Sequence, residues 1–70
     1  MKARQLLRLL ERELGYRVVR RTGSHLRLEA DGLAPLLFAF HDRDTIPPGL
    51  VRKILVKDVG LSIEDAEALL

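Results

Sequence analysis

Apolar and polar positions along this chain recur first with the period of a helix. Between Lys2 and Leu14 the apolar residues are spaced three or four apart, which predicts an amphipathic helix with one apolar stripe. Gly15 follows at the place where helices often end in a left-handed residue. The predicted stripe consists of Ala3, Leu6, Leu7, Leu10 and Leu14.

The period then changes to that of strands. Tyr16–Arg20 is rich in β-branched and aromatic residues, and His25–Ala30 alternates strictly between polar and apolar side chains. Thr22-Gly23-Ser24, between these two runs, has the composition of a turn. After a loop that begins at Asp31-Gly32, Leu36–His41 is predicted as a third strand.

Two further helices are predicted in the last third of the chain. Pro47-Pro48 suits the first turn of a helix, and Gly49–Val59 carries apolar residues on one side. Ser62 with Asp65 three residues later is a capping-box pattern, which opens a short terminal helix through Leu70. The predicted order is therefore helix, strand, strand, strand, helix and a short C-terminal helix.

This order predicts an α+β fold, a two-layer sandwich in which the two longer helices cover one face of an antiparallel sheet. The opposite face is expected to be open and to carry His25 and Arg27. If the bulky strand faces pair with Leu28 opposite Phe38, His25 falls opposite His41, with Cβ atoms roughly 5 Å apart. A register shifted by two residues would instead make the histidines diagonal or more distant.

Length and composition restrict the class of protein. The 70 residues make one domain, 1–70, and a hydrophobic content of 47% is typical of a packed globule. The absence of cysteine excludes disulfides and thiolate zinc sites and fits a cytoplasmic protein. Charges interrupt the apolar residues of the first 14 positions, and no window approaches the roughly 18 apolar residues of a membrane span. We therefore expect no contact with a membrane.

Charge is distributed unevenly along the chain. Residues 1–28 hold eight basic and two acidic side chains, a net charge of +6, and residues 29–70 hold four basic and eight acidic ones, a net charge of −4. Nine of the twelve basic residues are arginine, whose planar fork suits bidentate contact with phosphate. A basic N-terminal half indicates a surface for a polyanion such as nucleic acid, although an ordinary solvated face fits the charge equally well.

Gly23-Ser24-His25 carries the candidate chemistry, because histidine exchanges protons near neutral pH. Metal-free cleavage of RNA needs a base for the 2′-hydroxyl, a cation beside the charged phosphorane and an acid for the leaving oxygen. His25 is the candidate acid or base, and His41 is a candidate second one. The residues expected to hold phosphate are Arg20, Arg21 and Arg27.

Other interpretations of these residues remain open. A histidine at the edge of a strand can be a surface residue without a role, and the same basic surface fits an RNA-binding module that does not cut. His41, Asp42 and Asp44 could together bind a divalent metal for hydrolysis. Acidic residues in a loop before a helix also commonly cap the helix or stay solvated.

Nearly the whole chain follows an ordered set of motifs. They are Gly15-Tyr16, Val18-Val19-Arg20-Arg21-Thr22-Gly23-Ser24-His25, Phe40-His41, Ile46-Pro47-Pro48-Gly49, Val51-Arg52-Lys53-Ile54-Leu55 and Gly60-Leu61-Ser62. This set resembles the HicA mRNA-interferase toxins of bacterial and archaeal type II toxin–antitoxin systems. Two positions depart from the usual pattern of that family: Ala39-Phe40 stands where a proline usually precedes the second histidine, and Gly49-Leu50 stands in place of Gly-Thr.

The resemblance implies a fold similar to double-stranded-RNA-binding domains. It also implies an endoribonuclease that cleaves mRNA without a metal or small-molecule cofactor and is silenced by a HicB-like antitoxin protein. The catalytic histidine of the family falls on His25 and its motif glycine on Gly23, with Ser24 completing the supporting turn.

Overall fold

The elements of the chain follow one another in the predicted order. The computed structural model describes residues 1–70. It contains α1 (Ala3–Leu14), β1 (Arg17–Thr22), β2 (His25–Glu29), β3 (Leu36–Phe38), α2 (Pro48–Lys53), η1 (Ile54–Val59) and α3 (Ile63–Leu69). The predicted α+β fold is confirmed.

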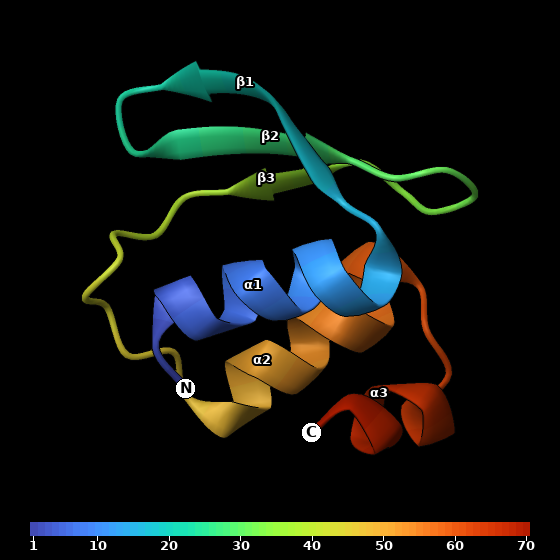
Figure 1. Ribbon diagram of the computed structural model, residues 1–70. Coiled ribbons are helices and arrows are strands. Elements are labelled where there is room, and N and C mark those ends of the chain that lie inside the picture. Colours follow the sequence, from blue (N-terminus) through green and yellow to red (C-terminus); the bar gives the residue numbers. More distant parts are fainter.

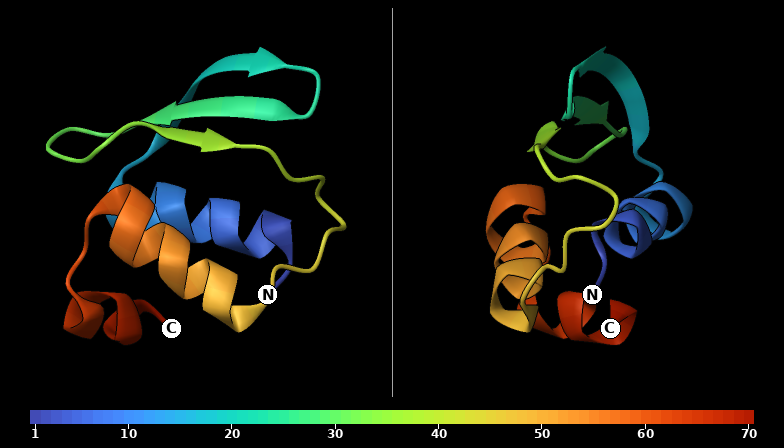
Figure 2. Two further views of the ribbon diagram at one scale, coloured as in Figure 1. Left: turned by 180° about the vertical axis from the view of Figure 1, so that it is seen from behind. Right: turned by 90° about the vertical axis from the view of Figure 1, so that its left-hand side faces the viewer.

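The sheet forms one layer, and α1 and α2–η1 lie beside each other beneath it (Figure 1). Its strands are antiparallel in the order β1-β2-β3. In the right-hand view of Figure 2, β1 lies on the side of α1 and β3 on the side of α2. The short helix α3 packs beneath the two longer helices, away from the sheet, so one face of the sheet has no helix over it.

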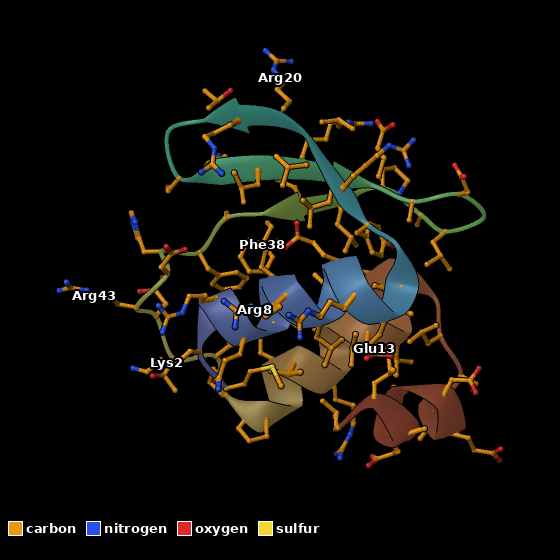
Figure 3. All side chains as sticks on the ribbon, in the orientation of Figure 1. Lys2, Arg8, Glu13, Arg20, Phe38 and Arg43 are labelled. Carbon is orange, nitrogen blue, oxygen red and sulfur yellow. The ribbon has the colours of Figure 1, made fainter.

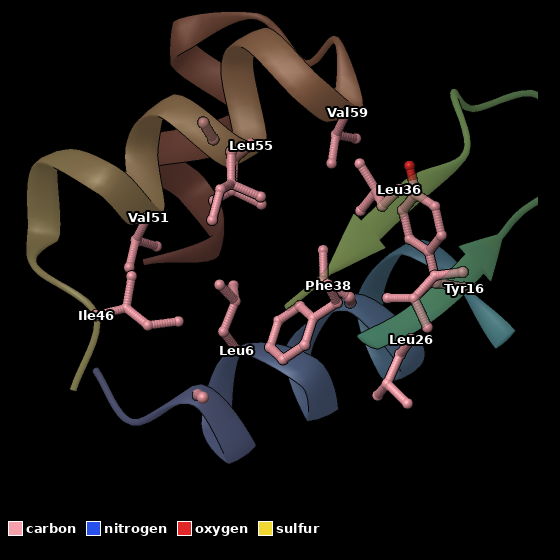
Figure 4. Close-up of a cluster of buried hydrophobic side chains, with 14 residues drawn as sticks. Leu6, Tyr16, Leu26, Leu36, Phe38, Ile46, Val51, Leu55 and Val59 are labelled. Atoms are coloured by element: carbon pink, nitrogen blue, oxygen red, sulfur yellow. The ribbon is translucent and has the colours of Figure 1, made fainter. Parts of the chain in front are cut away.

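The hydrophobic core lies between the covered face of the sheet and the helices. Its fourteen buried residues are all hydrophobic, and no polar side chain is buried. Phe38 points from β3 toward α1 (Figure 3) and packs among the other core side chains (Figure 4). From α1 the core receives Ala3, Leu6 and Leu10, and from the sheet Leu26, Leu28, Leu36 and Phe38. The helical and strand periodicities of the sequence therefore predicted the buried faces correctly.

Local signals at the helix ends act as the sequence indicated. Gly15 ends α1 with a φ of 73°, in the left-handed region. The backbone N–H of Asp65 donates a hydrogen bond of 3.0 Å to Ser62 Oγ, which caps the start of α3. The second helix begins at Pro48 and changes to π-helical hydrogen bonding over Ile54–Val59, a rare conformation that the sequence pattern did not indicate.

The predicted register between the second and third strands is wrong by two residues. Leu26 lies opposite Phe38 and Leu28 opposite Leu36, whereas we expected Leu28 opposite Phe38. Because side chains alternate with a period of two, a shift of two residues keeps every bulky side chain on the same face, and the apolar pattern cannot distinguish the two registers. The strand also ends at Phe38, three residues before His41, so His25 and His41 are not paired.

The first strand is longer than predicted and contains a β-bulge. Val18 lies opposite Leu28, but the next residue with a partner is Arg20, opposite Arg27, so Val19 is the extra residue. A bulge reverses which face each residue presents from that point along the strand. This irregularity decides which arginines of β1 share a face with His25.

Candidate active site

A two-residue turn places His25 at the first position of β2. Thr22 and His25 are paired across the hairpin, and Gly23 and Ser24 connect them. Gly23 has a φ of 61°, and no other atom lies within 4 Å of where a Cβ would stand. A glycine with positive φ at the first central position is typical of the type II′ hairpin turn. The turn therefore needs glycine for its backbone conformation and not for lack of space.

The bulge at Val19 divides the side chains of β1 between the two faces of the sheet. Directly opposed residues of antiparallel strands share a face. Arg20, opposite Arg27, therefore lies on the open face, and Arg21, opposite Leu26, points to the covered side. In Figure 3, Arg20 extends from the sheet away from the helices. Without the bulge, Arg20 would lie on the same face as Val18, which is opposite the buried Leu28.

On the open face, five side chains border a shallow hollow of about 230 Å³. They are Arg20, Thr22, His25, Arg27 and Leu37. The hollow thus combines one imidazole, two guanidinium groups and one hydroxyl, and Leu37, with 71% of its surface exposed, forms its apolar side. This is a set of groups that can exchange a proton and hold a negatively charged oxygen within one small area.

The two arginines of the hollow differ in whether they already form an ion pair. Arg27 Nε lies 3.2 Å from Glu29 Oε2, in an ion pair on the surface. Arg20 makes no ion pair. An exposed ion pair is worth little free energy, so Arg27 can turn toward an incoming anion, but the guanidinium of Arg20 is already unoccupied.

Two of the predicted site residues lie elsewhere. Arg21 and His41 border a second hollow of about 390 Å³, which reaches the core residues Leu26 and Phe38 on the covered side of the sheet. Gly23 and Ser24 of the turn border this second hollow as well. The structure therefore brings Arg20 and Arg27 together with His25, and it separates Arg21 and His41 from that group.

The residues considered for a metal do not gather into a ligand set. The backbone N–H of His41 donates a hydrogen bond of 2.9 Å to Asp44 Oδ2, so this carboxylate closes the loop that follows β3. No group of three or more histidine, aspartate or glutamate side chains in the chain is arranged to hold a metal ion.

Thr22 belongs to the hollow but was not among the predicted site residues. A two-residue loop of Gly23 and Ser24 pairs the residues on either side of it, so the turn rule alone would have placed Thr22 beside His25. Its hydroxyl can donate or accept a hydrogen bond at the edge of the hollow.

Fold and site together define a small α+β domain with a histidine and two arginines on an uncovered sheet face. A family model described as the HicA toxin of bacterial toxin–antitoxin matches residues 3–61 of the 70. The chain belongs to this HicA toxin family. No curated protein and no solved structure matches the chain. None of its helices has the length and apolar character needed to cross a membrane.

The matched range includes both hollows and ends before α3. α3 is nevertheless attached to the matched part of the chain. Ala66 is fully buried in the core, and Arg52 Nη2 of α2 lies 2.7 Å from Glu67 Oε1 of α3. The terminal helix is therefore packed as part of the same domain.

Proposed function

We propose that this protein is an endoribonuclease that cleaves mRNA without a metal ion and uses His25 as its general acid or base. The supporting observation is the hollow on the open face, where His25 lies with Arg20 and Arg27. The chain belongs to a family of toxins from toxin–antitoxin systems. Cleavage of mRNA is an activity by which so small a domain can be toxic.

In the proposed reaction, RNA supplies its own nucleophile. The imidazole of His25 takes the proton of a 2′-hydroxyl, and the 2′ oxygen forms a bond to the adjacent phosphorus. The bond from phosphorus to the 5′ oxygen then breaks, and that oxygen takes up a proton. The products are a 2′,3′-cyclic phosphate and a 5′-hydroxyl, with no net oxidation and no further reactant.

The arginines have an electrostatic role in this reaction. Negative charge increases on the phosphoryl oxygens as the 2′ oxygen attacks, and a fixed cation is most useful where charge develops. Arg20 and Arg27 border the hollow from two neighbouring strands, so a phosphate beside His25 has a guanidinium on either strand. Arginine supplies two parallel N–H donors to a phosphate, which also orients it.

His41 borders the other hollow. We therefore propose that water donates the proton that the leaving 5′ oxygen takes up. One general base typically accelerates a reaction by about 10²–10⁴-fold. Replacement of His25 by alanine should therefore reduce cleavage by a factor in this range and leave RNA binding in place.

Cleavage of RNA in the presence of EDTA tests the proposal. The protein and its His25→Ala variant are incubated with the same transcript, and products are resolved on a gel with their ends identified. Equal cleavage by both proteins would exclude His25 as the catalytic group. Binding without cleavage by either protein would favour an RNA-binding module that does not cut, and cleavage only with added Mg²⁺ or Mn²⁺ would favour a metal-dependent nuclease. A substrate with a 2′-deoxynucleotide at the cleaved position should resist the enzyme.

We propose further that a HicB-like antitoxin protein silences this activity. A toxin of a toxin–antitoxin system requires a partner in the cell, and a basic surface that binds RNA is suited to an acidic protein surface. Addition of the purified antitoxin at equal concentration should stop cleavage. Continued cleavage by a complex of the two proteins would contradict this assignment.

A further inference from the structure

The outer face of α1 carries a stripe of arginines that the catalytic proposal does not use. Ala3, Leu6 and Leu10 are fully buried against the sheet and α2. Arg4, Arg8 and Arg12 are exposed, and at 3.6 residues per turn they fall on the opposite side of the helix. Figure 3 shows Arg8 on α1, outside the core. We call Arg4, Arg8 and Arg12 the arginine stripe.

No arginine of the stripe has an acidic partner. Arg17, Arg27 and Arg52 each pair with a carboxylate, but no arginine of the stripe does. Glu11 lies three residues after Arg8, a spacing at which an ion pair can form, yet none is present. Like charges four residues apart also destabilise a helix. Ion pairing within the helix therefore gives no reason for these three residues to be arginine.

The stripe continues the positive charge of the candidate active site. The strand β1 and helix α1 lie on the same side of the molecule (Figure 2). All residues of β1 are exposed, and the strand carries Arg20, which borders the hollow at His25, and Arg21, which points to the covered side. Arg20 and Arg21 therefore place positive charge on both faces of β1, on the side of the molecule where α1 lies.

The other side of the molecule has a different character. The groove beside β3 and α2–η1 is lined by seven hydrophobic residues out of ten, and its charged residues are one lysine and one aspartate, Lys57 and Asp58. A long polyanion that occupies the hollow at His25 thus has a favourable path toward α1 and an unfavourable one toward β3.

The surface beside the stripe is concave. Arg8 and Arg12 border a hollow of about 370 Å³ between α1 and the end of α3, together with Gln5 and Leu9. Glu13 is the one acidic side chain that borders it. Two guanidinium groups and an amide therefore face a recess that can receive a phosphate group, while the neighbouring leucine supplies an apolar wall.

We propose that the arginine stripe is a second RNA-binding surface, which holds backbone phosphates of the strand whose cleaved bond lies at His25. This proposal rests on the proposed ribonuclease function and adds where the rest of the substrate lies. RNA is favoured over an acidic protein because the arginines repeat once per helical turn, as phosphates repeat along a strand, and because the guanidinium fork matches phosphate geometry.

The salt dependence of RNA binding tests the stripe. Arg8→Gln/Arg12→Gln is compared with Lys53→Gln/Lys57→Gln, which also removes two unpaired cations four residues apart on a helix but on the other side of the molecule. Both pairs are made in the His25→Ala protein, so that cleavage does not affect the measurement. Glutamine is a good helix former, which preserves α1, and circular dichroism verifies this.

For a single-stranded RNA of about 20 nucleotides, each lost phosphate contact reduces the slope of log affinity against log salt by about 0.7. The arginine variant should therefore show a slope smaller by about 1.4, and the lysine variant an unchanged one. A four-nucleotide RNA, which can fill only the hollow at His25, should bind both variants equally. Equal slopes for the two variants would overturn the stripe as an RNA surface.

Two further outcomes separate this proposal from the one on which it rests. If neither the His25→Ala protein nor its variants bind RNA at all, the ribonuclease assignment fails and the stripe with it. If RNA binding is intact and unchanged while the arginine variant alone loses the antitoxin, the stripe is a protein-binding surface and only the present proposal is refuted.

Discussion

Because of the bulge in β1, we expect substitutions at two adjacent arginines to have different effects. Arg20 lies on the open face beside His25, whereas Arg21 borders the hollow on the covered side. The two side chains are identical, both are exposed, and neither makes an ion pair. Arg20→Gln should therefore impair cleavage and Arg21→Gln should leave it nearly unchanged, although both variants lose one positive charge.

The expected size of the effect follows from the exposure of the site. Removal of one group that stabilises developing charge in a water-excluded active site costs about 10²–10³ in rate. The hollow at His25 is shallow and its residues are exposed, so water screens the interaction, and Arg27 remains on the neighbouring strand. We therefore expect Arg20→Gln to reduce kcat/KM by about 10- to 100-fold, which corresponds to about 1.4–2.7 kcal/mol of transition-state stabilisation.

A short RNA with a fluorophore and a quencher at its two ends provides the assay. Initial rates are measured in EDTA at low salt and again at physiological ionic strength, because a general effect of net charge on RNA binding weakens with salt. The difference between the two variants should persist at both salt concentrations. Equal losses for Arg20→Gln and Arg21→Gln, or a larger loss for Arg21→Gln, would refute the assignment of faces and the role of the bulge.

Three further predictions address the site and the stability of the fold. His41→Ala should leave cleavage of RNA nearly unchanged, because His41 borders the other hollow, and a loss as large as that of His25→Ala would show that His41 takes part as a second acid or base. Gly23→Ala should lower the free energy of unfolding by about 1–2 kcal/mol, measured with urea, because the residue at this position has a positive φ that alanine adopts only at a cost; no change would contradict the turn. Burial raises the pKa of Tyr16 above its ordinary value of 10.0, and its hydroxyl donates a 2.6 Å hydrogen bond to the carbonyl of Ala34. The unfolded chain therefore loses this proton first, so the contribution of Tyr16 to stability should be constant below about pH 10 and decrease above it. Tyr16→Phe should lack that alkaline decrease in thermal unfolding experiments, and an identical decrease in both proteins would show that another group causes it.

Features that depend on short stretches of sequence could be predicted. The apolar residues of α1 repeat at the helical period, Gly15 ends that helix, and Ser62 with Asp65 caps α3, each through interactions over a few residues. The strict alternation of β2 likewise identified Leu26 and Leu28 as core residues. These elements were sufficient to predict the α+β fold class and the face of the sheet that no helix covers.

Features that depend on how strands align could not be predicted. The two registers of β2 against β3 bury the same side chains, so apolar pattern alone could not favour Leu36 over Phe38 as the partner of Leu28. The bulge has no glycine to mark it, since Val18 and Val19 both suit a regular strand. For the candidate site this meant that Arg20, Arg21 and Arg27 were grouped by their proximity in sequence, and the structure divides them.

The bulge at Val19 has a consequence for how this domain tolerates change. Both parts of β1 pair with β2: Arg17 and Val18 lie before the bulge, and Arg20 to Thr22 lie after it. Val19, between these two parts, has no partner on β2. With Val19 deleted, every other residue of β1 can keep its partner on β2, so Arg20 stays opposite Arg27 and Val18 stays opposite Leu28. The strand can therefore lose this residue without any other side chain of β1 changing its face of the sheet.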